Sequence, residues 1–298
     1  MTPLLTTLAL LAFASNSILC RLALAPREID AGSFTLVRLV SGAVALLAIR
    51  AAARYRWAPA ALRPTVVRGF VPADGSKANP LRSWIPGFLL FLYAAPFSFA
   101  YVSIGAGTGA LILFACVQTT MLIGAIRSGE RFNPLEAIGL TVALGGLIYL
   151  VSPGLSAPSP LGSILMAIAG VSWGLYSLRG RGSSDPIGDT TRNFVRAVPF
   201  AVLAGLATLH AAHLSIRGTL LATASGTLAS GVGYSIWYTA LRGLTSIRAA
   251  IVQLLVPVLA AAGGVLLLSE PLTLRLVLSA VLILGGVGIV LAGRTSLR

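Results

Sequence analysis

The chain has 298 residues, of which 56% are hydrophobic and only 10% are charged, and its mean hydropathy is +0.90. A soluble domain carries about 25% charged residues, so this composition excludes an ordinary water-soluble protein and indicates a membrane protein. The net charge of +14 does not indicate nucleic-acid binding, because the basic residues lie between apolar segments and are not gathered on one face. Both cysteines, Cys20 and Cys116, lie within apolar segments, which argues against a disulfide framework.

Apolar segments recur along the whole chain. A helix that spans a bilayer needs ~20 mostly apolar residues, and ten segments meet this requirement. They are residues 3–24, 31–49, 84–104, 107–126, 133–151, 160–178, 191–211, 218–240, 247–268 and 272–292. The first segment is followed by a sequence that resembles a signal-peptide cleavage site, but no basic residue precedes it and it is long for a signal sequence, so we expect a membrane helix.

The distribution of basic residues predicts the orientation of these spans. If the N-terminus is cytoplasmic, sixteen of the 22 Lys and Arg residues lie on the cytoplasmic side, including those of the basic loop 51–83. Only four lie outside, and Arg38 and Arg196 lie within predicted helices. Because cytoplasmic loops carry an excess of Lys and Arg, we expect both termini in the cytoplasm of a bacterial cell and the protein in its inner membrane.

An internal repeat relates the two halves of the chain. Residues 105–151 align without gaps on 245–291 at an offset of 140, and an offset of 158 relates positions earlier in each half. The paired residues are Glu130 with Glu270, Gly145-Gly146 with Gly285-Gly286, Arg21 with Arg179, and Arg38 with Arg196. Chance alignment of two apolar stretches is the alternative explanation.

The repeat predicts two units, residues 1–151 and 152–298, each with five helices. Because five is odd, the second unit enters the membrane upside down relative to the first. Inverted repeats of this kind are typical of secondary transporters, in which one repeat rocks against the other around a central site. We therefore expect an all-α membrane protein with two inverted five-helix repeats around a central cavity.

Several motifs in the second half resemble those of a known family. They are Tyr238-Thr-Ala-Leu-Arg-Gly-Leu-Thr-Ser-Ile-Arg-Ala-Ala250, Leu255-Val-Pro257, Ser269-Glu270-Pro-Leu272 and Gly285-Gly286, with a weaker first-half copy in Gly129-Glu130-Arg131 and Gly145-Gly146. They are similar to the EamA family of the drug/metabolite transporter superfamily, and most similar to its bacterial amino-acid exporters. The resemblance implies a ten-helix exporter of small metabolites. It also implies a bend in the ninth helix at Pro257, whereas Val117 stands at the equivalent first-half position.

All eight acidic residues lie at predicted helix ends or in loops. They are Glu28, Asp30, Asp74, Glu130, Glu136, Asp185, Asp189 and Glu270. A proton-driven pump for cationic drugs would place a carboxylate near the bilayer midplane, where ionisable groups are costly and functional. We therefore expect an uncharged or zwitterionic substrate, and either facilitated movement or a coupling that uses no buried carboxylate.

Uncharged polar and aromatic residues at membrane depth are the candidates for substrate binding. The polar candidates are Asn16, Gln118 and Gln253, and the aromatic candidates are Tyr93, Phe97, Tyr101, Trp173, Tyr176, Tyr234 and Tyr238. An amide in hydrocarbon needs partners and therefore faces the bundle interior, so contact between helices explains each amide as well as substrate contact does. An aromatic cavity with a few amides suits a small amphiphilic solute, and plain packing is the equal alternative for the aromatic residues.

The remaining candidates are charged residues with structural or gating roles. Arg38 and Arg196 either snorkel toward an interface or form internal anchors that hold helix ends or a substrate carboxylate. Glu130 and Glu270 are either helix-end charges at the two water interfaces or parts of a gating ion pair.

These patterns together predict a secondary transporter of small neutral or zwitterionic metabolites that works by alternating access, and the family resemblance implies export of amino acids, either aromatic or other neutral ones. An efflux pump for another substrate class, an ATPase-dependent importer and a non-transporting receptor or scaffold are the alternatives. An intramembrane hydrolase is disfavoured, because it needs a catalytic base at membrane depth, whereas His210 and His213 lie at a predicted helix end and the sequence places no pair of aspartates at the midplane. We expect no cofactor, no metal and no nucleic acid. A monomer is sufficient, and the oligomeric state stays open.

Overall fold

The structure, a computed structural model, is helical over almost all of the residues it describes. The described residues are 2–57, 80–127, 134–152, 154, 157–180, 183, 185–241, 253 and 255–295. Within these ranges no β-strand occurs, and one isolated bridge joins Ile29 to Leu214.

The described helices form ten long segments, as the hydropathy pattern predicts, when three consecutive elements are counted as one. The first five are α1 (Thr2–Leu24), α2 (Ala31–Trp57), α3 (Pro80–Ala100), α4 (Ala106–Arg127) and α5 (Pro134–Val151). The others are α6 (Pro160–Gly180), α7 (Pro186–Ala207), the continuous run α8 (Ile216–Ala224), η3 (Ser225–Val232) and α9 (Gly233–Leu241), then α11 (Leu255–Leu268) and α12 (Leu274–Thr295).

Several of these helices are apolar enough to cross a membrane. By length and composition, four spans qualify among the described residues: Pro3–Leu24, Ala31–Ala52, Ser83–Ala100 and Pro160–Gly180. Shorter apolar helices cover Ala106–Met121, Thr141–Leu150, Leu255–Leu268 and Leu274–Gly286. The fold is therefore that of an all-helical membrane protein.

Local signals explain where the helices begin. Four helices start with a proline, at Pro80, Pro134, Pro160 and Pro186, a position at which the missing N–H costs nothing. Asp185 caps α7 by accepting a hydrogen bond from the Gly188 backbone N–H at 2.9 Å. This cap explains why α7 begins at Pro186 and not at residue 191, where the apolar window of the prediction began: a polar first turn does not register in hydropathy.

The run from α8 to α9 departs from the single regular helix that the sequence predicts over 218–240. Its middle, Ser225–Val232, is a π-helix, a conformation that is rare and frequently occurs at functional sites. The π-helix packs very closely on α2: a Cβ added to Gly226 would lie 2.2 Å from the backbone oxygen of Arg38. Only glycine fits there. The hydrogen bond from Ser230 Oγ to the Ser225 carbonyl spans five residues and lies within the same turn.

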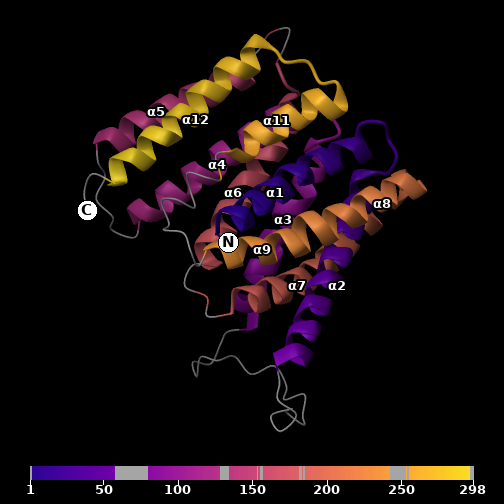
Figure 1. Ribbon diagram of the computed structural model, residues 1–298. Helices are drawn as coiled ribbons and strands as arrows, with labels where there is room; N and C mark the ends of the chain where they lie inside the picture. The colour runs from indigo at the N-terminus through magenta and orange to yellow at the C-terminus, as the bar shows by residue number, and fades with distance from the viewer. Residues whose placement is uncertain are drawn as a thin grey trace.

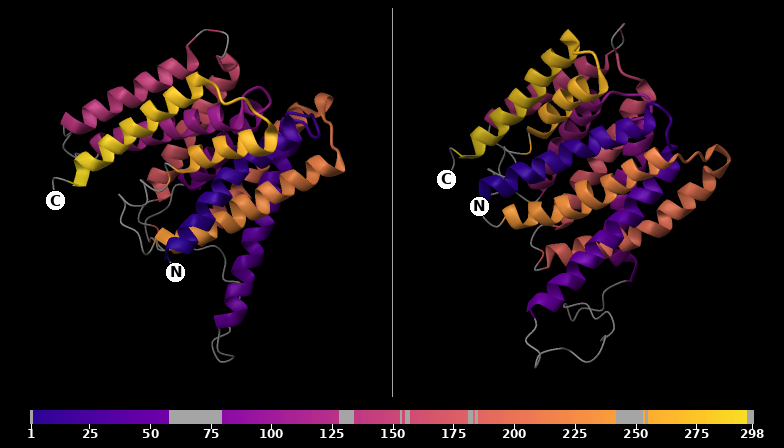
Figure 2. Two further views of the ribbon diagram at one scale, coloured as in Figure 1. Left: turned by 45° about the horizontal axis from the view of Figure 1, so that its top comes forward. Right: turned by 45° about the vertical axis from the view of Figure 1, so that its right-hand side comes forward.

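The helices pack in a central group with a separate pair at one edge. α5 and α12 lie side by side at that edge (Figure 1) and contact α4. In the central group, α1 packs on α9 and α11, α6 packs on α3 and α4, and α2 packs on α7. α1 begins and α12 ends at the same end of the bundle (Figure 2).

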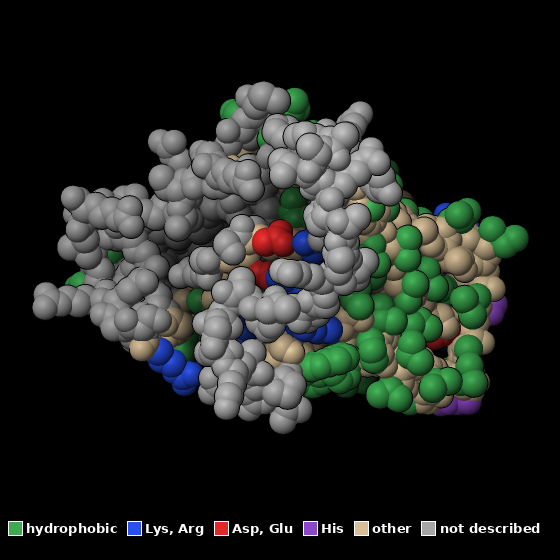
Figure 3. Space-filling model, turned by 90° about the horizontal axis from the view of Figure 1, so that it is seen from below, with side chains coloured by type: hydrophobic (Ala, Val, Ile, Leu, Met, Phe, Trp, Pro, Cys, Tyr) green, Lys and Arg blue, Asp and Glu red, His purple; other side chains and the backbone are tan. Residues whose placement is uncertain are grey.

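Large apolar side chains cover the outside of the described bundle. Leu4, Ile148, Leu203, Leu266 and Val281 are each 64–80% exposed. Seen from below, hydrophobic side chains form a broad flank, and several of the visible charged side chains gather near the middle of the face (Figure 3). Soluble monomers rarely expose contiguous apolar surface of this extent, so lipid is the solvent that this surface fits.

Candidate functional site

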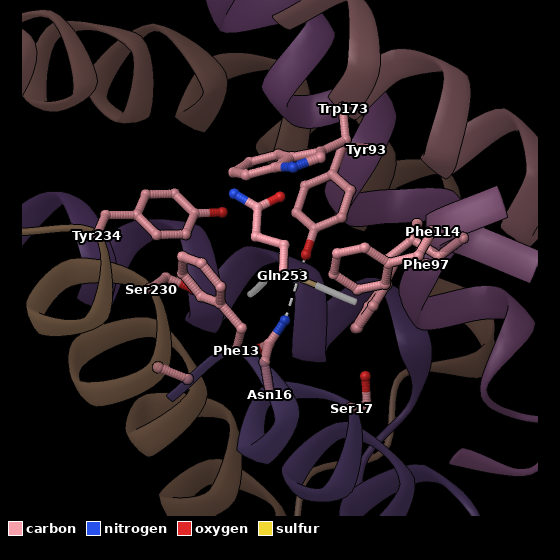
Figure 4. A pocket seen from close by; sticks show the side chains of 12 residues that line it. Phe13, Asn16, Ser17, Tyr93, Phe97, Phe114, Trp173, Ser230, Tyr234 and Gln253 are labelled. Atoms are coloured by element: carbon pink, nitrogen blue, oxygen red, sulfur yellow. Dashed lines mark hydrogen bonds between the residues drawn. The ribbon is translucent and has the colours of Figure 1, made fainter. Parts of the chain in front are cut away.

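A small cavity lies inside the central helix group, among α1, α3, α4, α6, η3 and α9 (Figure 4). Its lining combines aromatic, small and amide side chains: Phe13, Asn16, Ser17, Tyr93, Phe97, Leu113, Phe114, Trp173, Ala229, Ser230, Tyr234 and Gln253. The cavity volume is about 30 Å³, which is room for a few water molecules. A solute larger than that enters only if the walls separate.

Aromatic rings form a continuous wall around this cavity. The Trp173 ring lies 4.8 Å from that of Tyr93 and 5.2 Å from that of Tyr234, measured between centroids. Phe13 packs edge-on against Tyr234 at 5.7 Å, and Phe97 lies 5.4 Å from Tyr93. These rings come from α1, α3, α6 and α9, so the wall joins helices of both halves of the chain. Tilted and edge-on arrangements are those that aromatic pairs prefer.

A chain of hydrogen bonds crosses the floor of the cavity. Ser225 Oγ donates to Asn16 Oδ1 at 2.6 Å, and Asn16 Nδ2 donates to Tyr93 Oη at 3.4 Å. Arg38 Nη2 donates to the same Tyr93 oxygen at 3.1 Å. The bond from Ser225 fixes which end of the Asn16 amide faces Tyr93. In Figure 4 the Gln253 amide projects toward the space between Tyr234 and Trp173.

Six of the ten candidate substrate-binding residues line this cavity: Asn16, Tyr93, Phe97, Trp173, Tyr234 and Gln253. Tyr101 and Tyr176 lie one ring further out. Tyr101 packs edge-on against Phe97 at 4.7 Å and its hydroxyl donates to the Ala106 carbonyl, whereas Tyr176 stacks on Trp173 at 5.4 Å. Tyr101 follows Ala100, the last residue of α3, and its backbone N–H donates to the Phe97 carbonyl at 3.2 Å, so the aromatic stripe continues just beyond the cavity lining.

Two further candidates do not contribute to the described wall. Gln118 lies on α4 beyond Leu113 and Phe114, the two α4 residues that line the cavity, and is partly exposed. The Tyr238 side chain lies outside the described residues.

Sequence reasoning missed several lining residues, chiefly Phe13, Ser17 and Ser230. Phe13 lies three residues before Asn16 and four before Ser17, so helical spacing from a buried amide was a usable signal for Phe13, and spacing from Phe13 for Ser17. Ser230 lies in the π-helix, where the helical period of 3.6 residues does not predict which side chains face inward.

The two arginine candidates differ in burial. Arg38 is 2% exposed and lies behind the aromatic wall, whereas Arg196 is half-buried and donates to the Ser83 carbonyl. Glu130 lies outside the described residues. Pro257 is buried in the first turn of α11. Residues 242–252 and 254, on the N-terminal side of this helix, are not described, so the bend expected there stays a prediction.

Glu270 joins three segments at the end of the bundle opposite the start of α1. Its carboxylate accepts the Ala106 backbone N–H at 2.8 and 3.0 Å and pairs with Arg21 Nε at 3.1 Å. Arg21 Nη1 also donates to the Tyr101 carbonyl at 2.9 Å. The carboxylate thereby caps the N-terminus of α4, where the helix dipole favours negative charge. We call Arg21, Glu270 and the Ala106 N–H the Glu270 tie.

Asp30 links the α1–α2 and α7–α8 connections at the same end of the bundle through hydrogen bonds from backbone N–H groups. Its Oδ1 accepts the Ser33 N–H at 2.9 Å and caps α2, and its Oδ2 accepts the His213 N–H at 3.0 Å. Desolvation raises the pKa of Asp30, but the hydrogen bonds from Ser33 and His213 outweigh it, so its pKa lies below the ordinary value. Nearby, Ser215 Oγ donates to Glu28 Oε2 at 2.6 Å. The α1–α2 and α7–α8 connections are therefore tied together.

The fold and the cavity define an all-helical membrane protein with an aromatic cavity inside its helix bundle. Residues 160–292 match the EamA-like transporter family. An uncharacterized protein of Pseudomonas aeruginosa is 48% identical over 98% of this chain and 95% of its own length. A protein of Escherichia coli K12 named "Probable amino-acid metabolite efflux pump" is 31% identical over 67% of this chain and 73% of its own length.

A solved crystal structure has the same fold, with a TM-score of 0.59 over 95% of both chains at 20% sequence identity. The chain belongs to the EamA-like transporter family, as its motifs suggested. The resemblance of the sequence motifs to this family of membrane transporters is thus confirmed.

Proposed function

We propose that this protein exports small neutral or zwitterionic amino acids across the bacterial inner membrane by alternating access. The observation that supports this most strongly is the cavity itself, an aromatic wall with amide and hydroxyl groups enclosed between helices of the two halves. Aromatic faces suit an apolar side chain, and amides suit an amino and a carboxyl group. The name of the Escherichia coli relative, an amino-acid metabolite efflux pump, supports the same substrate class.

The charge of the cavity supports a substrate without net positive charge. The described acidic side chains, Glu28, Asp30, Asp185, Asp189 and Glu270, lie at helix ends or in connections, and none of them lines the cavity. A cationic drug would have no carboxylate to neutralise it in the described wall. Burial of an unpaired charge is costly.

Alternating access requires two units that move against each other, and the proposed units are residues 1–151 and 152–298. Contacts between helices support this division, because they occur in matched pairs when the two halves are exchanged. α3 packs on α6 as α8–α9 packs on α1, and α4 packs on α6 as α11 packs on α1. Three further contacts, α2–α7, α4–α11 and α5–α12, each join a helix of the first half to its own counterpart in the second half, so exchanging the halves leaves them unchanged. An inverted repeat produces this pattern of contacts.

The glycine pairs support the same repeat. A Cβ added to Gly146 or Gly286 would lie within 2.7 Å of atoms of the facing helix, whereas Gly145 and Gly285 have nothing within 4 Å. In both pairs, therefore, the first glycine has open space around it and the second packs closely on the facing helix.

The ties at one end of the bundle suggest how access is controlled. The Glu270 tie joins α1, the α3–α4 connection and the α11–α12 connection, and the positive-inside distribution places this end outside. We propose that the tie is the outer gate, closed in this conformation. The small volume of the cavity fits a conformation that must open before a solute enters.

Transport by the purified protein in liposomes tests the proposal. Liposomes loaded with labelled aromatic, branched-chain, small, basic and acidic amino acids are compared with protein-free liposomes. Faster efflux of neutral amino acids is expected, with little effect on the basic ones. An imposed pH gradient shows whether protons are coupled to the movement. An absence of flux for every solute would contradict the transporter assignment of this chain, and flux of basic amino acids alone would contradict the substrate class.

A further inference from the structure

Arg38 carries a positive charge in the interior of the protein without an acidic partner among the described residues. Its side chain is 2% exposed, and the described ion pairs join other residues: Arg21–Glu270, Arg50–Asp185, Arg192–Asp189 and Arg217–Glu28. One guanidinium nitrogen, Nη1, is buried and has no hydrogen-bond partner in the described structure. A buried charge normally needs both a counter-charge and full hydrogen bonding, so this arrangement lacks an anion.

The cation lies directly behind two residues of the cavity wall. The guanidinium carbon is 5.2 Å from the centroid of the Tyr93 ring and 4.9 Å from that of Phe97. Both rings line the cavity. The contacts with the ring faces hold the guanidinium in place, but they do not neutralise it. The field of the charge therefore reaches the cavity through one layer of side chains in a setting of low dielectric constant.

The Tyr93 hydroxyl connects the positive charge of Arg38 to the cavity by a hydrogen bond. Its oxygen accepts two hydrogen bonds, from Arg38 Nη2 at 3.1 Å and from Asn16 Nδ2 at 3.4 Å. A tyrosine hydroxyl also has one proton to donate, and within the described residues no acceptor for this proton is found. A hydroxyl whose oxygen accepts from a cation is a stronger donor than an ordinary one. An acceptor in the cavity would complete the group.

We propose that Tyr93, polarised by Arg38, binds the carboxylate of the transported solute, so that the site selects monocarboxylates and rejects their uncharged or cationic derivatives. The solute then lies with its carboxylate toward α2 and α3 and its apolar part against Trp173 and Tyr234. Amino acids and their 2-oxo acid analogues share this carboxylate, whereas amides of amino acids lack it. The inference rests on the proposed transport of amino acids and adds the element that orients them. Arg38 acts through Tyr93 and is a positioning residue.

The second-half counterpart of Arg38 shows what a structural anchor looks like. Arg196, related to Arg38 by the offset of 158, is half-buried and donates to the Ser83 carbonyl where α3 begins. Arg196 does not line the cavity, and its printed hydrogen bond goes to the backbone at the start of α3. Arg196→Gln therefore serves as the matched control for Arg38→Gln.

Competition in proteoliposomes tests the inference. Uptake of labelled phenylalanine and, separately, of labelled leucine is measured against three unlabelled competitors of the same side chain: the amino acid, its amide and its 2-oxo acid. With the wild-type protein we expect the 2-oxo acid to compete within about tenfold of the amino acid and the amide to be weaker by tenfold or more. An amide that competes as well as the amino acid would overturn the inference, while flux itself would leave the proposed transport intact.

Single substitutions distinguish an effect of the Arg38 charge on substrate selection from a general effect on folding. Arg38→Gln and Tyr93→Phe should each reduce the preference for the acid over the amide at least fivefold, Arg38→Lys should retain most of it, and Arg196→Gln should leave the ratio unchanged. A purely structural role would slow transport of all solutes without moving this ratio. If Arg38→Gln does not fold, Tyr93→Phe and the wild-type competition still decide the matter. Absence of flux for either labelled amino acid and for the wider panel would instead remove the proposed function.

Discussion

Single polar side chains in the described interior form hydrogen bonds with more than one helix. Asn16 is the clearest case, since its amide links η3 through Ser225 to α3 through Tyr93. A midplane amide of this kind was visible in the sequence, as were Trp173 and Tyr234, because polar or aromatic residues stand out in an apolar segment. Ser230 was not visible, since its inward direction depends on the π-helix.

Asp30 gives a prediction about pH. Its pKa is lowered in the folded protein by the hydrogen bonds from Ser33 and His213, so its stabilising effect is present above the pKa of the unfolded chain and is lost as the pH falls through the lower folded value. Asp30→Asn removes the bond from the His213 N–H and the titration, and should cost about 1 kcal/mol at pH 7. Thermal unfolding in detergent at pH 7 and at about pH 2, below the ordinary carboxyl pKa, measures this. We expect the wild-type advantage to shrink at the lower pH; an unchanged difference at both pH values would contradict the role of Asp30.

At the scale of elements, the contact between α5 and α12 depends on glycine. A Cβ on Gly286 would lie 2.5 Å from the Gly139 carbonyl oxygen and 2.6 Å from the Ala143 nitrogen, both of which are backbone atoms that cannot give way cheaply. Gly286→Ala should therefore destabilise the protein by ~1–3 kcal/mol. Gly285→Ala is the matched control, because nothing lies within 4 Å of its position, and it should be neutral or stabilise the helix by up to ~1 kcal/mol. Thermal unfolding of both variants in detergent checks the pair, and equal effects would refute the close contact.

The Glu270 tie gives a second prediction at this scale. Arg21 and Glu270 are only 21% and 17% exposed, whereas the Arg217 side chain of the Arg217–Glu28 pair is 65% exposed. Glu270→Gln removes a charged acceptor from the N-terminus of α4 and should cost about 1.5–3 kcal/mol, whereas Arg217→Gln should cost less than about 1 kcal/mol. Chemical or thermal unfolding compares the two. If the tie is also the outer gate, Glu270→Gln should change the rate of transport in proteoliposomes, and a normal rate would exclude that role.

Most elements could be predicted from hydropathy, because a membrane span needs a long apolar run whatever it packs against. The ends of α7 and the irregular middle of the α8–α9 run could not. Asp185 and Pro186 begin α7 in a polar stretch. The π-helix packs closely on α2 at Gly226, and a tertiary contact of this kind has no signature in a hydropathy window.

At the scale of the whole molecule, the predicted orientation can be mapped directly. In a background with Cys20→Ser and Cys116→Ser, single cysteines are introduced as Ala212→Cys, in the exposed α7–α8 connection, and as Gly180→Cys, at the exposed end of α6. A membrane-impermeant maleimide added to intact cells should label Ala212→Cys, and should label Gly180→Cys only after the cells are permeabilised. The reverse pattern would place both termini outside and overturn the predicted orientation.

If the aromatic cavity is the path of an amino acid, counterflow in proteoliposomes should depend on the rings that line it. Vesicles loaded with an unlabelled neutral amino acid should accumulate the labelled one transiently when they contain the wild-type protein. Trp173→Ala should reduce this accumulation at least tenfold, because its ring contacts both Tyr93 and Tyr234 across the cavity. Trp84→Ala, the same substitution at an exposed residue that packs on Phe200, should leave accumulation near the wild-type level. Equal accumulation in the wild-type and Trp173→Ala proteins would show that the solute does not use this cavity.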